Sequence, residues 1–250
     1  MKPKPARKRL DLLLVERGCA DSPQKAMAMI LAGEVQLDGQ RVEKAGMPVA
    51  EDARIEIISR RQKFVSRGGT KLEGALEDFA IEPAGCVCLD IGASNGGFTD
   101  CLLQHGAERV YAVDVNVEQL DWKLRQNPRV IPIERNAREL RAQDLPESVG
   151  LVVIDVSFIS VRKVIAPAVA LAKPGAGFLI LIKPQFELRR EAIGHGGIVK
   201  DQKLHDQAIR IVRKCVESVG PHCLGVRPSH LLGAEGNQEY FLHARKKTLE

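Results

Sequence analysis

The stretch Asp90-Ile-Gly-Ala-Ser-Asn-Gly-Gly-Phe98 decides the fold of this chain. It follows the apolar run Val87-Cys-Leu89, and a second apolar segment ends at Asp114. A buried strand that leads into a glycine-rich turn brings backbone N–H groups and a helix N-terminus against a ligand, because glycine permits a close approach. A second acidic residue about 20 positions further on can hold a ribose through its hydroxyls. The pattern therefore predicts a nucleoside-cofactor site.

The identity of the cofactor depends on position 94. The dinucleotide fingerprint requires glycines at 92, 94 and 97, and the middle glycine lets the backbone approach a pyrophosphate. In this chain Ser94 stands in place of that middle glycine. S-adenosylmethionine has no phosphate to bind, so the pattern favours it over NAD. We expect the cofactor-binding residues to be Asp90, Gly92, Ser94, Gly96, Gly97, Phe98, Asp114, Asn136 and Asp155.

Apolar segments alternate with helical patterns beyond residue 72. Strands are expected at 87–91, 110–114, 130–133, 150–155, 177–183, 222–226 and 239–244, and helices near 97–105, 117–126, 161–172 and 203–219. This alternation predicts an α/β domain with a mostly parallel seven-stranded sheet covered on both faces, the Rossmann-like fold of class I methyltransferases. The last two strands are expected to form the antiparallel edge typical of such enzymes.

The N-terminal 59 residues form a separate small α+β module in this interpretation. Helices are expected over 10–18 and after Ser22-Pro23, a hairpin over 35–42 around Asp38-Gly39, and a last strand over 54–58. These segments resemble the RNA-binding fold named after ribosomal small-subunit protein S4. The predicted domains are 1–59 (S4-like), 60–71 (basic linker) and 72–250 (methyltransferase). By position, the RNA-contacting candidates are Arg7, Arg9, Arg17, Lys25, Arg41, Lys44 and, in the linker, Arg67.

Charge and composition narrow the classes of function. Residues 1–63 hold 13 Lys and Arg against 9 Asp and Glu, so this quarter of the chain carries most of the net charge of +5 and favours a nucleic-acid partner. The longest apolar runs are far shorter than the roughly 20 residues of a membrane span, and no secretory signal is visible. We therefore expect a cytoplasmic protein with no membrane association, and a monomer without an obligate protein partner.

The six cysteines are scattered and form neither a Cys-x-x-Cys pair nor a spacing with histidine that suits zinc. We expect reduced thiols and no metal site.

In an open α/β sheet the ligand lies beyond the carboxyl ends of the strands, and Asp90, Asp114, Asp155 and Lys183 each end a predicted strand. Four ionisable residues at one edge indicate a catalytic site.

The segment after the fourth strand bears on the methyl acceptor. Asp155-Val-Ser-Phe158 lacks the two prolines typical of enzymes that methylate exocyclic amines, and no cysteine lies between Cys101 and Cys215 to serve pyrimidine carbon-five methylation. A hydroxyl acceptor is therefore favoured, with base methylation on the same fold left open. A ribose hydroxyl needs a group to take its proton, and Lys183 is well placed for this because lysine acts as a base when desolvated or crowded by another cation.

Several motifs together resemble the TlyA family, whose members also carry the name haemolysin A. They are Ser66-Arg-Gly-Gly-Thr-Lys-Leu72, Asp90 to Leu103, Asp155-Val-Ser-Phe-Ile-Ser160, Lys183-Pro-Gln-Phe-Glu187 and Gly236-Asn-Gln-Glu-Tyr240. The resemblance implies cytidine 2′-O-methylation of ribosomal RNA with S-adenosylmethionine and the catalytic Lys-Asp-Lys-Glu tetrad of FtsJ enzymes. The tetrad falls on Lys71, Asp155, Lys183 and Glu239.

The resemblance leaves alternatives open for the RNA substrate and for the class of function. Family members of this length tend to modify the large-subunit 23S rRNA, whereas longer ones also modify the 16S rRNA, so either rRNA or an assembled subunit is an expected partner. The segment 227–236 differs from the usual family sequence before the last strand, which affects contacts with the acceptor. A membrane-active haemolysin is disfavoured because no segment is long enough to insert. An RNA-binding protein without catalysis is the remaining alternative.

Overall fold

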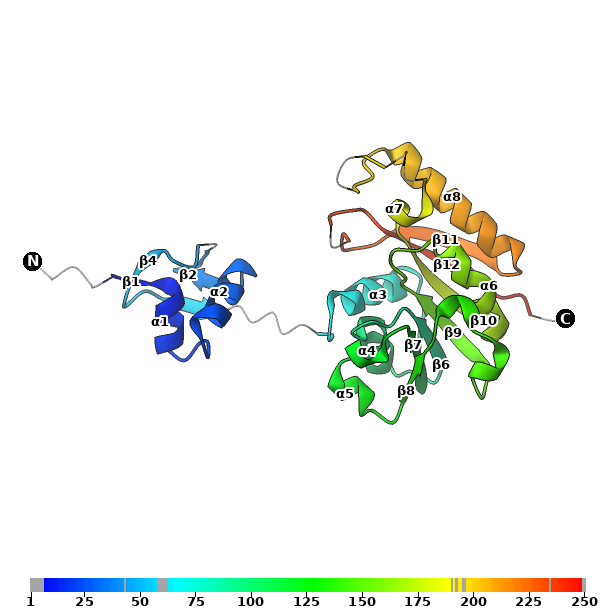
Figure 1. Ribbon diagram of the computed structural model, residues 1–250, viewed down its shortest axis with the longest axis horizontal. Coiled ribbons are helices and arrows are strands. Elements are labelled where there is room, and N and C mark those ends of the chain that lie inside the picture. Colours follow the sequence, from blue (N-terminus) through cyan, green and yellow to red (C-terminus); the bar gives the residue numbers. More distant parts are fainter. Residues whose placement is uncertain are drawn as a thin grey trace, which may run out of the picture. The chain divides into compact units, whose positions relative to one another are not determined.

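The computed structural model describes residues 7–42, 44–57, 63–189, 191, 193–194, 197–233 and 235–248. The chain divides into two units, Met1–Arg61 and Gln62–Glu250 (Figure 1). Each unit has a hydrophobic core of its own. The domain boundary expected between residues 59 and 60 lies outside the described residues.

Two short helices and two small sheets make up the described part of the N-terminal unit. The helices are α1 (Leu10–Glu16) and α2 (Pro23–Leu31). The strands are β1 (Arg7–Arg9), β2 (Val35–Leu37), β3 (Gln40–Arg41), β4 (Pro48–Ala50) and β5 (Ile55–Ile57). β1 pairs with β4, and β2 lies between β3 and β5, all antiparallel. Asp38 and Gly39 both have positive φ in the turn from β2 to β3, so the predicted hairpin is confirmed.

The core of the N-terminal unit is small because its elements are short. The side chain of Ser22 fixes the start of α2 by accepting a hydrogen bond from the backbone N of Lys25 at 3.2 Å. Apolar residues of both helices then pack against the strands. The buried members are Leu10, Leu13, Leu14, Ala20, Ala26, Ile30, Val35, Val42 and Val49. This leaves most charged side chains of the unit at its surface.

A seven-stranded sheet in the order β11-β12-β10-β9-β6-β7-β8 organises the C-terminal unit. Its strands are β6 (Val87–Ile91), β7 (Arg109–Asp114), β8 (Val130–Glu134), β9 (Val149–Ile154), β10 (Ala172–Ile182), β11 (His222–Pro228) and β12 (Tyr240–Arg245). The five strands from β6 to β10 run parallel, and β12 is antiparallel to both of its neighbours. The predicted sheet and its antiparallel edge are confirmed.

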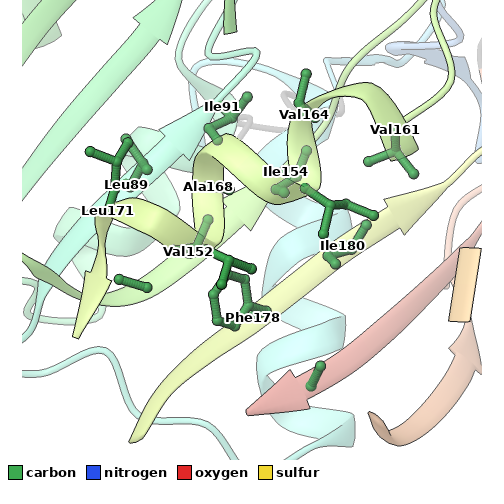
Figure 2. Close-up of a cluster of buried hydrophobic side chains, with 14 of the residues drawn as sticks. Leu89, Ile91, Val152, Ile154, Val161, Val164, Ala168, Leu171, Phe178 and Ile180 are labelled. Atoms are coloured by element: carbon green, nitrogen blue, oxygen red, sulfur yellow. The ribbon is translucent and has the colours of Figure 1, made fainter. Parts of the chain in front are cut away.

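Helices cover both faces of this sheet. The helices are α3 (Arg67–Asp78), α4 (Gly97–Gln104), α5 (Trp122–Arg125), α6 (Arg162–Leu171), α7 (Pro184–Glu187) and α8 (Gln202–Ser218). In β10, Phe178 and Ile180 belong to the core under α6 and α8, whereas Leu179 and Leu181 belong to the core under α3 and α4. Figure 2 shows part of the first core, including Val164 and Ala168 of α6. This alternation explains why buried parallel strands are apolar on both sides.

Helix α3 is the main departure from the sequence prediction. Residues 60–71 were expected to form a linker, but α3 begins at Arg67. The Gly68-Gly69 pair has a low helix propensity, which hides the helix in the sequence. Gly69 is needed there because a Cβ atom at that position would lie 2.3 Å from Cγ of Phe64. Burial of the apolar face of α3 against α4 therefore outweighs the weak propensity of its first turn.

The helix expected near 117–126 is also divided. A 3₁₀ turn, η1 (Val117–Gln119), is followed by Leu120, whose extended backbone separates the turn from α5. Asp121 then caps α5 by accepting a hydrogen bond from the backbone N of Lys123 at 2.9 Å. Two further 3₁₀ turns, η2 (Ala137–Glu139) and η3 (Ala142–Asp144), follow β8.

Candidate active site

Four ionisable residues meet at one edge of the C-terminal sheet. Asp90 lies near the end of β6, Asp114 ends β7, Asp155 follows β9, and Lys183 follows β10. These four strands are consecutive neighbours, and the chain order reverses between β6 and β9. Ligands of open α/β sheets bind at such a switch point, beyond the carboxyl ends of the strands.

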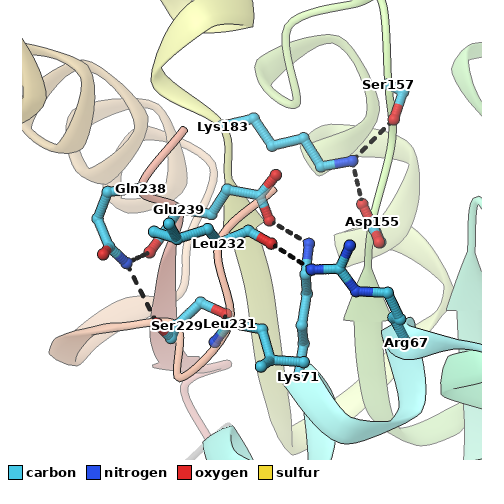
Figure 3. Close-up of polar contacts among 10 residues, drawn as sticks. All are labelled: Arg67, Lys71, Asp155, Ser157, Lys183, Ser229, Leu231, Leu232, Gln238 and Glu239. Carbon is cyan, nitrogen blue, oxygen red and sulfur yellow. Dashed lines mark hydrogen bonds and ion pairs between the residues drawn. The ribbon is translucent and has the colours of Figure 1, made fainter. Parts of the chain in front are cut away.

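Two lysine–carboxylate contacts stand beside each other at this edge (Figure 3). Nζ of Lys71, from α3, donates to Oε2 of Glu239 at 2.6 Å. Nζ of Lys183 lies 2.5 Å from Oδ1 of Asp155 and donates to Oγ of Ser157 at 2.7 Å. Both lysines and Glu239 are buried. The structure thus brings together all four residues of the expected tetrad, and adds Ser157.

Glu239 reaches this edge because β12 runs against the other strands. The residue before the start of β12 therefore lies at the same edge as the residues that follow the parallel strands. Gly233 permits the close packing of the preceding turn, since a Cβ atom there would lie 2.6 Å from Oε1 of Glu239. The backbone of that turn is held by a hydrogen bond from N of Gly233 to O of Asn237 at 2.8 Å.

A cavity of about 180 Å³ reaches Lys71 and Asp155, one member of each lysine–carboxylate pair. Its wall combines the start of α3, the glycine-rich turn after β6 and the end of β9. It is lined by Ser66, Arg67, Gly68, Lys71, Gly92, Ala93, Ser94, Asn95, Gly97, Phe98 and Asp155. Five of the expected cofactor residues therefore line it. Ser66 and Gly68 were missed as cofactor candidates, because the start of α3 carries no recognisable cofactor motif.

The glycine-rich turn has the conformations that its glycines allow. Gly92 has φ of +86°, and a Cβ atom there would lie 2.1 Å from the carbonyl oxygen of Asp155. A Cβ atom at Gly97 would lie 2.2 Å from Oγ of Ser66, so this glycine lets the N-termini of α3 and α4 approach. The turn thus leaves open space where side chains would otherwise stand, and backbone groups can reach a ligand.

Asp90 is fully buried beneath this turn. Its Oδ2 accepts a hydrogen bond from Oγ1 of Thr99 at 2.6 Å, whereas Oδ1 has no hydrogen-bond partner among the described residues. Burial raises the pKa of Asp90 to about 7, and the hydrogen bond from Thr99 opposes that shift. An unpartnered buried carboxylate oxygen suits a ligand that carries hydrogen-bond donors, such as an amino group.

Asp114 and Asn136 shape the loops beside the cavity without lining it. Oδ2 of Asp114 accepts from the backbone N of Ser94 at 2.9 Å, which holds the glycine-rich turn to the end of β7. The side chain of Asn136 accepts from the backbone N of Arg138 at 3.2 Å and so caps η2. Gly96, at φ of +91°, packs against Leu124. Direct contact of these three residues with a cofactor stays a prediction.

The basic candidates of the N-terminal unit are all exposed, and four of them also make contacts within the unit. Arg17 donates to the carbonyl oxygens of Glu51 and Ala53, and Arg9 binds the buried Asp11 at 2.7 Å. Lys25 pairs with Asp21, and Arg41 donates to the carbonyl oxygen of Ala32. Arg7 and Lys44 are exposed, while Arg67 lines the cavity of the C-terminal unit and donates to O of Leu232 at 3.1 Å.

Two other features bear on the class of protein. All six cysteines are free thiols, and the described residues contain no cluster of His, Cys, Asp and Glu that could hold a metal ion. In the same part of the chain, no helix combines the length and apolar character needed to span a membrane.

The strand order, with β12 antiparallel between β10 and β11, and the glycine-lined cavity at the switch point define a Rossmann-like methyltransferase. The sequence profile of the FtsJ-like methyltransferases matches residues 64–246, and that of the S4 domain matches residues 8–55. The chain therefore belongs to the FtsJ-like methyltransferase family, with an S4 domain in its N-terminal unit.

Individual relatives confirm the resemblance to the TlyA family. The 16S/23S rRNA (cytidine-2′-O)-methyltransferase TlyA of Mycobacterium tuberculosis is 44% identical over 97% of this chain and 91% of its own. Hemolysin A of Brachyspira hyodysenteriae is 40% identical over 94% of this chain and 98% of its own. A solved structure from Streptococcus thermophilus, provisionally named a hemolysin, is 35% identical with a TM-score of 0.76 and covers 97% of this chain and 89% of its own.

Proposed function

We propose that the protein transfers a methyl group from S-adenosylmethionine to the ribose 2′-hydroxyl of a cytidine in ribosomal RNA. The observation that carries this proposal is the pair of buried lysine–carboxylate contacts, Lys71–Glu239 and Lys183–Asp155, beside a glycine-lined cavity. The M. tuberculosis relative, named for cytidine 2′-O-methylation of both rRNAs, supports the choice of acceptor.

The cavity and its surroundings supply the features that the cofactor requires. In this proposal the turn around Gly92 and Gly97 admits the ligand, and the unpartnered oxygen of Asp90 receives its amino group. Asp114 would hold the ribose, and Asn136 would lie towards the adenine. When bound, S-adenosylmethionine supplies an electrophilic methyl group on its sulfonium.

The four ionic residues then perform the proton chemistry. The amine of Lys183 would accept the proton of the 2′-hydroxyl as the methyl group leaves the sulfonium sulfur, which becomes a thioether, and bonds to that oxygen. The ammonium that results is stabilised by Asp155 and by the hydroxyl of Ser157, both already in contact with Nζ. Lys71, held by Glu239, stabilises the negative charge that develops on the hydroxyl oxygen.

The S4 domain provides the RNA-binding part of this proposal. Its exposed basic residues would contact phosphates of structured rRNA, which positions the substrate without reading its sequence. We assign the protein to the cytoplasm, where ribosomal subunits are its partners, and propose that it acts as a monomer. The 23S rRNA is the expected substrate, with the 16S rRNA as the second.

Nucleoside mass spectrometry tests the proposal. Unmodified ribosomal subunits and naked rRNA are incubated with the protein and methyl-labelled S-adenosylmethionine, then digested to nucleosides. Labelled 2′-O-methylcytidine is the expected product. A labelled base would instead identify a base methyltransferase on the same fold, and RNA binding without any label would identify an RNA-binding protein without catalysis.

A lysine substitution tests the assigned base. We expect Lys183→Ala to lower kcat by roughly 10²–10⁴ and to leave cofactor affinity nearly unchanged, because the amine acts on the acceptor rather than on the cofactor. Lys173→Ala is the matched control, since Lys173 is an exposed lysine near the other end of the same strand. Equal kcat in the two variants would exclude Lys183 as the base.

A further inference from the structure

Glu187 is a buried carboxylate one helical turn beyond Lys183. It ends α7, and its side chain is only 1% exposed. Burying an ionised carboxylate is costly unless donors satisfy its oxygens. The contacts of Glu187 should therefore show what the residue contributes.

All the hydrogen-bond donors that the structure assigns to Glu187 come from the start of α6. Oε1 accepts from the backbone N of Val161 at 2.7 Å. Oε2 accepts from Oγ of Ser160 at 2.6 Å and from Nε of Arg162 at 3.3 Å. The positive end of the α6 dipole further stabilises the carboxylate. Glu187 thus fastens the end of α7 to the start of α6.

These contacts fix the far ends of the two segments that carry the catalytic pair. The segment 155–161 connects β9 to α6 and begins with Asp155, whereas α7 follows directly on Lys183. The near ends meet through Lys183, Asp155 and Ser157. Between the two ends, the rings of Phe158 and Phe186 lie 5.6 Å apart. The two segments therefore run side by side, in contact along their length.

The position of α7 depends on such contacts. A helix of four residues has no stability of its own, because it makes too few hydrogen bonds to offset the cost of its nucleation. Similarly, the exposed Phe158 has φ of +66°, a backbone conformation that bulky residues rarely adopt without support. Glu187 restrains both segments at once.

We propose that Glu187 is a positioning residue that sets the distance between Lys183 and Asp155. This inference rests on the proposed function of Lys183 as the base. Loss of the Glu187 contacts releases α7 and the segment after β9 from one another, and the amine of Lys183 is then no longer held against Asp155 and Ser157. A displacement of about 1 Å in a catalytic group can cost up to 100-fold in rate.

Kinetics of Glu187→Ala and Glu187→Gln test the inference. We expect kcat to fall roughly 10- to 100-fold in Glu187→Ala and less in Glu187→Gln, which can still accept from N of Val161, while the affinity for S-adenosylmethionine changes less than about threefold. Arg162→Ala removes one of the hydrogen-bond donors to Glu187. Because the Arg162 side chain is partly exposed, this change should disturb folding less than a change of the buried Glu187, and we expect a smaller fall in kcat.

Glu147→Ala is the matched control. Glu147 also accepts hydrogen bonds from an arginine and a hydroxyl, those of Arg109 and Tyr111, but it precedes β9 and so lies at the edge of the sheet opposite the active site. We expect it to lower the melting temperature and to leave kcat unchanged. If the Glu187 variants retained the kcat of Glu147→Ala, or lost activity only in proportion to cofactor binding, the inference would be wrong.

Chemical labelling separates this inference from the proposed function. The amines are labelled with trinitrobenzenesulfonate, and peptide mass spectrometry gives the rates for Lys183 and Lys71. We expect Glu187→Gln to speed labelling of Lys183 several-fold and to leave Lys71, held by Glu239, unchanged. An unchanged Lys183 rate would contradict positioning by Glu187, whereas absence of 2′-O-methylcytidine with the wild-type protein would contradict the proposed function alone.

Discussion

At the scale of single residues, the burial of Asp90 has a measurable consequence. Its pKa is raised by burial to about 7, from an ordinary value of 3.8. Between these two pH values the folded state holds a proton that the unfolded state has lost. The contribution of Asp90 to the free energy of unfolding is therefore most favourable at low pH and declines as the pH rises through about 7.

Asp90→Asn should remove this dependence on pH. Asparagine keeps an oxygen that can accept from Thr99 but does not ionise. We expect the melting temperature of the wild type, relative to the variant, to fall as the pH is raised from 5 to 8. Thermal denaturation at several pH values measures it. Thr99→Val is the companion variant, because it removes the hydrogen bond that opposes the raised pKa of Asp90. We expect the fall in melting temperature with pH to be larger in Thr99→Val than in the wild type. Parallel curves for wild type and Asp90→Asn would contradict the raised pKa.

The sequence predicts only part of the site at this scale. Asp155 and Lys183 could be found because each follows an apolar run that predicts a strand, and strand ends gather at one edge. Lys71 and Glu239 lie 168 residues apart, and no local pattern connects them, so only a family resemblance pointed to them. Ser157 and Ser66 give no signal in sequence, because their roles depend on which neighbours the fold supplies.

At the scale of elements, the turn after β6 allows a matched pair of glycine substitutions. Gly92→Ala should destabilise the protein by about 1–2 kcal/mol for its left-handed backbone and by more for the clash with the carbonyl of Asp155. Gly85 has φ of +69° and open space around it, so Gly85→Ala should show only the backbone cost. Urea unfolding measures both.

The same pair also tests the site. Since the clash at Gly92 is with backbone, Asp155 must move to relieve it, and we expect Gly92→Ala to lower both cofactor affinity and kcat. Gly85→Ala should keep both at wild-type values. Equal destabilisation by the two substitutions would show that the turn and the end of β9 are not packed as the structure has them.

Elements whose apolar residues form a continuous run or a helical spacing could be predicted from the sequence, whereas α3 could not. The strands of the parallel sheet are continuous apolar runs, and α8 has its buried residues at helical spacing. The first five residues of α3 include two glycines and a lysine that is buried only in the fold, and this composition predicts a basic loop. Its apolar face becomes informative only once α4 and Phe64 are in place.

At the scale of the whole molecule, the uneven distribution of charge leads to a prediction for RNA binding. We expect the combined change Arg7→Glu, Lys25→Glu and Lys44→Glu to weaken rRNA binding and to flatten its dependence on salt, because fewer counterions are released. The slope of log affinity against log salt should fall by roughly 2–3. Filter binding across a range of salt concentrations measures this slope.

The control reverses three exposed lysines of the C-terminal unit, Lys163, Lys173 and Lys203. It changes the net charge by the same amount but leaves the S4 domain intact. We expect a smaller change in slope than for the S4 variants. Equal slopes in the two triple variants would mean that the net charge of the protein, rather than the S4 domain, governs its affinity for rRNA.

The antiparallel course of β12 also determines when, during synthesis, a growing chain contains all the residues of the candidate active site. Lys71 leaves the ribosome early in synthesis of the C-terminal unit, whereas its partner Glu239 comes late, directly before the strand that completes the sheet. An unfinished chain can thus contain the S4 domain, the cofactor turn and three of the four ionic residues without a complete site. If the proposed roles of these residues hold, we expect newly made protein to bind ribosomal RNA at that stage without yet modifying it.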